Sequence, residues 1–177
     1  MSSRVILANT EDVWNNLIDN YREPTLVLFD GSVASACGYA SSATGPFYCP
    51  GDEKLYLDLS FFEEMERKMN APGELARAYV VAHEVGHHIQ KLMGITDQMN
   101  RLRGQLSQTE YNKYSVRLEL QAEQTALCTG DKPSGCQFTE TVVLSRGEGE
   151  FVTVRHIVIG GSNRDIGKKI AEIARER

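Results

Sequence analysis

The spacing of apolar positions changes along the chain and predicts helices that alternate with short strands. Apolar residues three and four apart predict a helix from Thr10, its cap, to the break at 22–24. A continuous apolar run then predicts a buried strand at 25–29. Small residues dominate 30–44, where we expect an ordered loop.

A hairpin and a short helix are predicted next. Apolar segments at 47–48 and 55–59 flank a Pro-Gly-Asp turn, which is typical of a hairpin. The sequence Ser-Phe-Phe-Glu at 60–63 has the spacing of a capping box, and we expect it to begin a helix that runs to about Met69.

Two long helices follow, joined by a polar connection. The first is predicted to start at Asn-Ala-Pro 70–72 and to end at Gly94, since proline is favoured in the first turn and glycine just after the last. A second capping box at 107–110 predicts a helix to about Thr129, with Gly130 as its terminator.

The C-terminal part predicts two strands, at 141–144 and 151–159, around a turn at 147–149, and a polar helix at 164–177. Together with the preceding elements this predicts an α+β protein. At 177 residues with 41% hydrophobic content, we expect residues 1–177 to form a single domain.

Composition excludes some classes of partner. The net charge of -5 is spread along the chain and no run of Lys and Arg is present, which argues against nucleic acid binding. No window has the roughly eighteen apolar residues of a membrane span, and the first residues lack the features of a signal peptide. We therefore expect a soluble chain as it stands, with any membrane anchor or export signal lying before the apolar run at 5–7. Oligomeric state is not predicted.

Four cysteines form two local pairs, Cys37 with Cys49 and Cys128 with Cys136. Neither pair has CxxC spacing, which argues against a zinc site built from cysteines. Disulfides would indicate an oxidising compartment, whereas free thiols would act as small buried hydrophobes in a reducing cell. We favour the disulfides, although other pairings can be drawn.

The segment His83-Glu84-Val85-Gly86-His87 carries the strongest chemical signal and lies within a predicted long helix. Imidazoles four residues apart share one helix face and can reach the same metal ion, while Glu84 can hold and deprotonate a water beside them. A catalytic zinc takes three protein ligands. The sequence therefore predicts one Zn²⁺ held by His83, His87 and one further donor.

The second long helix offers that donor, because Glu119 and Glu123 lie four residues apart on it. Taken alone, they would be solvated charges paired with basic neighbours. They share a helix face with small residues that allow close approach of the histidine helix: Ser115, Ala122 and Ala126. We expect Glu119 to be the third ligand and Glu123 to accept the other ring N–H of a ligating histidine.

Other candidates carry less weight. His88 points about 100° away from His87 around the helix and so off the metal face. His156 lies in an alternating strand, where a lone histidine is usually structural. A residue that stabilises an oxyanion is predicted by type only. The candidates are Tyr79, Tyr111, Tyr114 and Arg117.

Several successive motifs add to this picture: SACG at 35–38, SATGPFYCP at 42–50, YLDLSFF at 56–62, AYVVAHEVGHH at 78–88 and VRLELQA at 116–122. Together they resemble the bacterial putative neutral zinc metallopeptidase family over about residues 5–127. The resemblance implies a zincin-like fold, with a small sheet packed on the HExxH helix and a glutamate ligand of the gluzincin type at Glu119. The family is commonly exported or membrane-anchored, which implies an extracytoplasmic bacterial location, with the cytoplasm as the alternative.

The chain departs from that family at Glu123 and Gln124, where Asp followed by Cys is usual, and over 129–177. The leading hypothesis is a zinc peptidase, an endopeptidase acting on peptides or proteins, in which Glu84 is the general base for a metal-activated water. The alternatives are an inactive zincin-like protein with a structural or partner-binding role, and a metal hydrolase with another substrate. We expect the hairpin at 47–59 to supply a rim strand for an extended peptide.

Overall fold

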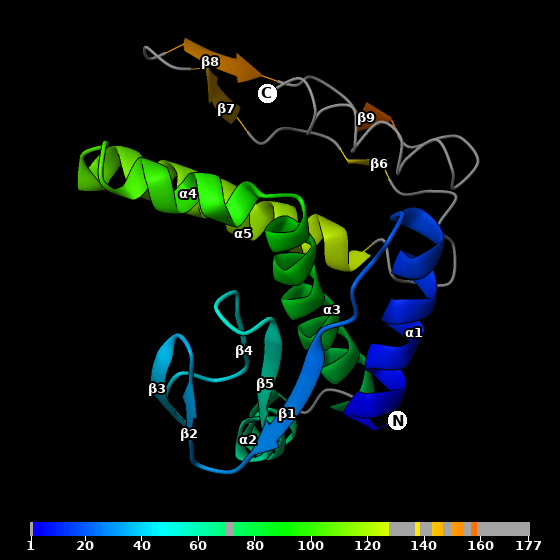
Figure 1. Cartoon of the computed structure of the whole chain (residues 1–177). Coiled ribbons are helices and arrows are strands. Elements are labelled where there is room, and N and C mark those ends of the chain that lie inside the picture. Colours follow the sequence, from blue (N-terminus) through cyan, green and yellow to red (C-terminus); the bar gives the residue numbers. More distant parts are fainter. Residues whose placement is uncertain are drawn as a thin grey trace.

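The computed structural model describes residues 2–69, 73–127, 137–138, 143–146, 150–153 and 157–158 (Figure 1). Five helices and a small mixed sheet lie within these residues, so the predicted α+β class is confirmed. None of the helices described is both long and apolar enough to span a lipid bilayer.

A three-stranded sheet with the order β1-β5-β4 lies beside the helices. Strand β1 (Thr25–Phe29) runs parallel to β5 (Lys54–Asp58), and β4 (Phe47–Cys49) runs antiparallel to β5. The predicted strand at 25–29 and the predicted hairpin are therefore confirmed. Because β5 is central, both of its faces are buried, and β4 is left at an edge of the sheet.

The two faces of the sheet pack against different partners. Leu55 and Leu57 point towards the helices, whereas Tyr56 points to the opposite face, as the alternation of a strand requires. There Tyr56 stacks on Phe47 with ring centroids 4.7 Å apart. Val33 from the following hairpin packs against the same cluster.

The ordered loop predicted for 30–44 is wrong, because this segment contains a hairpin of β2 (Ser32–Ser35) and β3 (Gly38–Ser41). Its small side chains gave little alternation from which strands could be predicted. A disulfide between Cys37 and Cys49 joins the turn of this hairpin to β4. The edge strand is thus tied covalently to its neighbouring hairpin.

Helix α1 (Ser3–Leu17) begins at Ser3, not at Thr10 as predicted. Thr10 lies inside the helix, where its hydroxyl donates to the carbonyl oxygen of Leu7 at 2.7 Å. The helix starts early because Ile6 and Leu7 extend the apolar face that packs into the core. A residue of cap-forming type was therefore mistaken for a cap.

Helix α2 (Leu59–Met69) also begins earlier than the predicted capping box. Asp58 accepts hydrogen bonds from the backbone N–H and hydroxyl of Ser60, at 3.0 and 2.8 Å, and so serves the first turn instead. Helix α3 (Gly73–Leu92) is the predicted long helix, and Gly94, with φ of 74°, ends it as predicted.

The predicted polar connection after Gly94 contains a helix that was not predicted, α4 (Ile95–Arg103). Its buried residues are Ile95 and Met99, too narrow an apolar stripe to stand out in the sequence. Helix α5 (Gln108–Leu127) begins at the predicted capping box. The Ser107 hydroxyl donates to Glu110 at 2.7 Å, and the Glu110 N–H donates back to Ser107.

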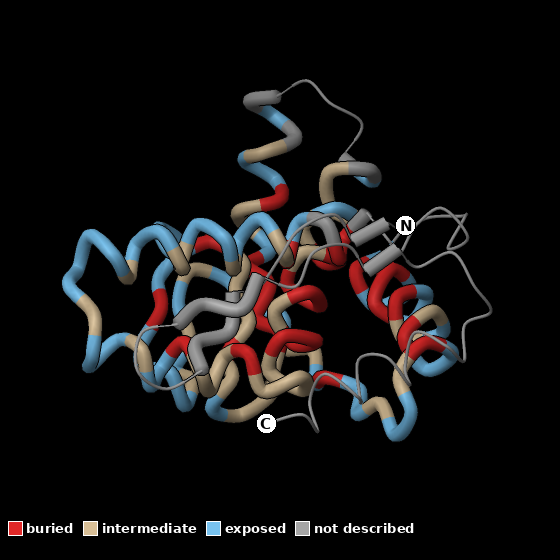
Figure 2. The backbone as a smooth tube through the Cα atoms, turned by 90° about the horizontal axis from the view of Figure 1, so that it is seen from above, coloured by how far each residue is buried: buried red, intermediate tan, exposed pale blue. Residues whose placement is uncertain are grey.

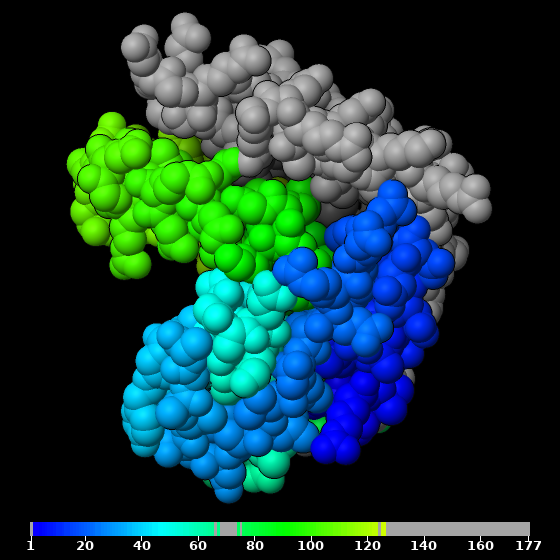
Figure 3. Space-filling view, in the orientation of Figure 1, coloured from blue at the N-terminus to red at the C-terminus, as the bar shows by residue number. Residues whose placement is uncertain are grey.

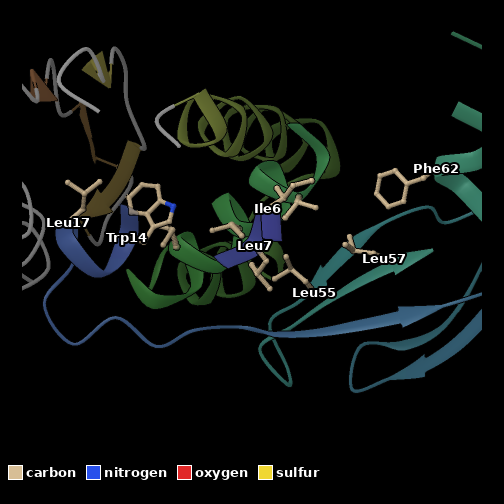
Figure 4. Close-up of a cluster of buried hydrophobic side chains, with 10 residues drawn as sticks. Ile6, Leu7, Trp14, Leu17, Leu55, Leu57 and Phe62 are labelled. Atoms are coloured by element: carbon tan, nitrogen blue, oxygen red, sulfur yellow. The ribbon is translucent and has the colours of Figure 1, made fainter. Parts of the chain in front are cut away.

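The main apolar core lies where α1, α2, α3 and β5 meet, and Figure 2 shows the buried positions gathered in this interior. Figure 4 shows side chains from α1, α2 and β5 that converge there. The buried members are Ile6, Leu7, Trp14, Leu17, Leu55, Leu57, Phe62, Val81, Val85 and Ile89. The core therefore fixes one side of α3 against α1 and the sheet.

Near the C-terminus, β7 (Val143–Arg146) pairs with β8 (Glu150–Thr153), and β6 (Gln137–Phe138) pairs with β9 (Ile157–Val158). Within the strand predicted at 151–159, the structure describes β8 and β9, and the residues between them lie outside the described ones. The other C-terminal predictions lie outside the described residues. They are Cys128 with Cys136, the terminator Gly130, His156 and the helix at 164–177.

Candidate metal centre

Helices α3 and α5 cross closely at Gly86. A Cβ atom at this position would lie 2.7 Å from the carbonyl oxygen of Ala122, closer than such atoms approach one another in proteins. Ala122 and Ala126 are buried, at 0% and 6% exposure, in line with the expectation that small residues allow close approach. The glycine inside the HExxH segment thus sets the distance between the helices that carry the candidate ligands.

His83, His87 and Glu119 come together at this crossing. The Nε2 atoms of the two histidines are 3.2 Å apart, and the Glu119 Oε2 atom lies 3.3 Å from His83 Nε2 and 3.4 Å from His87 Nε2. Among the described residues, these three form the cluster with the geometry to hold a metal ion. The structure therefore places the three predicted ligands side by side.

The spacing of these atoms fits a zinc ion. Zn²⁺ binds imidazole nitrogen and carboxylate oxygen at about 2.0–2.2 Å in tetrahedral geometry, which separates any two ligand atoms by about 3.3–3.6 Å. The three observed separations of 3.2, 3.3 and 3.4 Å are close to the shorter edges of such a tetrahedron. The donor set of two imidazoles and one carboxylate would leave a fourth vertex for another ligand.

The charges within the cluster support one another. Hydrogen bonds with His83 and then His87 hold the pKa of the Glu119 carboxyl well below its usual range. Burial works to lower the pKa of His87, but the hydrogen bond with Glu119 and the charge of Glu84 together raise it. The cluster thus favours an ionised carboxylate at Glu119, the form that binds a cation.

Gln90 holds the second ring nitrogen of His87. Its Oε1 atom lies 2.9 Å from His87 Nδ1, and its Nε2 atom donates to the carbonyl oxygen of Leu118 at 2.7 Å and to Gln121 Oε1 at 3.0 Å. The residue lies one helical turn beyond His87, on the same face of α3. Sequence reasoning missed Gln90, although this spacing could have indicated it.

Glu123 does not take the role predicted for it. Its carboxylate accepts a hydrogen bond from the Tyr79 hydroxyl at 2.6 Å, which raises the pKa of Tyr79 to about 12. The ring of Tyr79 stacks on that of His83 with centroids 6.4 Å apart. Glu123 therefore supports the ligand His83 through a tyrosine ring and not through a ring N–H.

Glu84 is buried, at 8% exposure, beside the two histidines. Burial raises the pKa of its carboxyl to about 7, an effect opposed by the charges of His87 and His83 and by a hydrogen bond from the backbone N–H of Tyr48. That N–H belongs to the edge strand β4. A carboxyl group with a pKa near neutrality can accept and release a proton at physiological pH.

His88 lies on the other side of α3, as predicted. It is fully buried, with Nε2 facing the carbonyl oxygen of Arg22 and Nδ1 2.9 Å from the Tyr48 hydroxyl. A carbonyl only accepts, so Nε2 carries the hydrogen and Nδ1 accepts from Tyr48. Burial lowers the pKa of His88 in keeping with this neutral form. His88 thus anchors the residue whose N–H binds Glu84.

A cleft of about 370 Å³ opens beside the cluster. Figure 3 shows the surface hollowed between the strands β2–β4 and the helices α4 and α5. The cleft is lined by residues in and beside the edge strand β4 and by residues of the helices that carry the candidate ligands and of α4. They are Pro46, Phe47, Tyr48, Pro50, His83, Glu84, His87, Thr96, Leu118 and Glu119.

The four residues predicted by type to stabilise an oxyanion are not in this lining. The Arg117 guanidinium lies 5.7 Å from the centroid of Tyr114, and the Arg103 guanidinium lies 5.6 Å from that of Tyr111. Tyr79 binds Glu123. Tyr79 stacks on His83, but none of the four lines the cleft where a substrate would lie.

Comparison with known proteins identifies relatives. The family described as "Putative neutral zinc metallopeptidase" matches residues 1–141, beyond the end at 127 expected from the sequence. The uncharacterized protein YpfJ of Escherichia coli K12 is 47% identical over 123 residues, covering 67% of this chain and 43% of YpfJ. The uncharacterized protein Rv2575 of Mycobacterium tuberculosis H37Rv is 41% identical over 121 residues, covering 67% of this chain and 40% of Rv2575.

The chain thus spans less than half the length of these curated relatives. No solved structure is significantly similar to it.

Proposed function

Since the chain belongs to the neutral zinc metallopeptidase family, we propose that it is a zinc-dependent peptidase of zincin-like fold that cleaves internal peptide bonds. The single observation that carries this proposal is the triangle of donor atoms from His83, His87 and Glu119, with sides of 3.2, 3.3 and 3.4 Å. A triangle of this size needs the close crossing of α3 and α5, which a glycine permits.

The residues of the chain would divide the chemistry between them. Bound zinc would act as a Lewis acid and lower the pKa of a water molecule. His83, His87 and Glu119 would hold the ion, while the buried Glu84 takes a proton from the attacking water and passes it to the leaving amine. The raised pKa of Glu84, about 7, suits a group that accepts and then donates a proton.

The edge strand supports an extended peptide as substrate. Strand β4 lies at the end of the sheet, and Pro46, Tyr48 and Pro50 beside it line the cleft. A peptide can add to such an edge through backbone hydrogen bonds. Prolines have no N–H, and the Tyr48 N–H is bound to Glu84, so this edge would chiefly offer carbonyl oxygens to the substrate.

The test is cleavage of a diverse peptide library by the zinc-loaded protein and by Glu84→Gln. The variant should lose activity by about 10²–10⁴-fold, as expected for loss of a general base, while it still binds one zinc ion. Glu63→Gln, the same change at an exposed position on α2, should cleave at the wild-type rate. Equal activity of wild type and Glu84→Gln would exclude the proposed mechanism.

A further inference from the structure

Gln90 links the two helices that carry the candidate ligands. It extends from α3, is 1% exposed, and makes hydrogen bonds with His87 on its own helix and with Leu118 and Gln121 on α5. A buried amide with all these partners is a costly group to remove, because each partner left unpaired loses its hydrogen bond. The amide therefore makes the relative position of the helices specific.

The orientation of this amide follows from one of its partners. The Leu118 carbonyl oxygen can only accept, so the Gln90 atom 2.7 Å away must be the NH₂ nitrogen. The amide oxygen then faces His87 Nδ1, which must carry the ring hydrogen. A bound metal ion would displace the hydrogen that Nε2 shares with Glu119, and the lone pair of His87 would then be on Nε2, the atom that faces His83 and Glu119.

The two histidines differ in this support. His83 Nδ1 is buried and has no hydrogen-bond partner among the described residues, whereas His87 Nδ1 has Gln90. A partner on the second nitrogen fixes both the ring orientation and the tautomer of a ligating histidine. Among the described residues, Gln90 makes the hydrogen bond that could fix the ring and tautomer of His87.

We propose that Gln90 is a positioning residue of the metal centre, which presents His87 Nε2 to the ion and ties His87 to the backbone of α5 beside Glu119. This inference rests on the proposed function, since it assumes that the cluster binds zinc. Gln90 acts on two ligands at once, because Leu118, whose carbonyl it binds, directly precedes Glu119.

Zinc affinity measured by competition with a chromophoric chelator tests the proposal without reference to activity. Gln90→Met keeps a similar volume but removes the amide, and it should weaken zinc binding by about 10–100-fold, as loss of such a partner typically does. Gln105→Met, the same change at an exposed position, should keep the wild-type affinity. Gln121→Met leaves the contacts with His87 and Leu118 in place and should have a smaller effect than Gln90→Met.

A conservative variant separates positioning from simple loss of packing. Gln90→Glu keeps an oxygen against His87 Nδ1 and should bind zinc more tightly than Gln90→Met. In NMR spectra of zinc-loaded protein with ¹⁵N-labelled histidine, the Nδ1–H of His87 should exchange slowly in the wild type and rapidly in Gln90→Met. These spectra and circular dichroism would show whether each variant is folded.

The outcomes separate the two proposals. If the wild type binds no zinc, the proposed function fails and this inference fails with it. If the wild type binds zinc and folded Gln90→Met binds within twofold of it, this inference alone is overturned. Equal affinities of folded Gln90→Glu and Gln90→Met would likewise overturn it.

Discussion

The two sides of helix α3 differ in kind. The side that faces α1 and the sheet is largely apolar, with Val81, Val85 and Ile89 buried in the main core. The side that faces α5 carries His83, Gly86, His87 and Gln90, which meet their partners through hydrogen bonds and one very close backbone approach. The first side contributes buried apolar area to the core. The second side positions the candidate ligand atoms.

Stability and the geometry of the site therefore depend on different sides of α3. Apolar burial contributes about 25 cal/mol per Å² and tolerates small shifts, whereas a metal site needs its ligands within a few tenths of an ångström. Changes on the apolar side should therefore alter folding far more than zinc binding. Changes on the side of α5 should alter zinc binding more than folding.

The largest effect on folding is expected for Trp14→Ala in α1. Trp14 is 1% exposed in the core that holds the apolar side of α3, and its truncation should lower the free energy of unfolding by about 3–5 kcal/mol. Urea denaturation would measure this change. Zinc affinity of the folded protein should stay within a few-fold of the wild type, and a loss as large as that of Gln90→Met would contradict the division.

Gly86→Ala should disturb the side of α3 that faces α5. The added Cβ would lie 2.7 Å from the Ala122 carbonyl oxygen, which forces the helices apart at a cost of about 1–3 kcal/mol. Because Glu119 lies on α5 beside this crossing, zinc affinity should fall by at least about tenfold. Gly104→Ala is the matched control, since nothing lies within 4 Å of a Cβ at that position. Wild-type zinc affinity in Gly86→Ala would show that the close crossing does not position Glu119.

Tyr48→Phe tests a residue that belongs to both regions. Tyr48 lies on the edge strand β4, binds the buried His88 and lines the cleft. The variant loses the hydroxyl that donates to His88 Nδ1 at 2.9 Å, at a cost of about 1–2 kcal/mol in unfolding free energy. Zinc affinity should be unchanged, because the lost hydroxyl binds His88, which is not a candidate ligand. Peptide cleavage should fall modestly in kcat, since loss of this anchor loosens the residue whose backbone N–H binds Glu84. A changed zinc affinity with unchanged kcat would reverse this expectation.

Local signals explain which parts were predictable from the sequence. The start of α5 was predicted because the box of Ser107 and Glu110 is a local hydrogen-bonding pattern. His83 and His87 could be grouped because their spacing on one helix suffices. Placing Glu119 also required a second helix, which the small residues Ala122 and Ala126 indicated.

The failures occurred where tertiary contacts decide. Thr10 is a residue type common at caps, but α1 begins before it because Ile6 packs into the core. Glu123 and Gln90 both had suitable side chains to hold a histidine nitrogen, and the crossing of α3 and α5 decides between them. The distance between the crossing helices is set by backbone atoms of Gly86 and Ala122. The spacing of residues along the sequence does not predict that distance.

The most direct test of the central claim is a crystal structure of the zinc-loaded protein, with anomalous diffraction recorded on both sides of the zinc absorption edge. We expect one anomalous peak within bonding distance of His83 Nε2, His87 Nε2 and the Glu119 carboxylate, with Gln90 on His87 Nδ1. A peak bound by other residues, or Glu119 turned away from both histidines, would contradict the account.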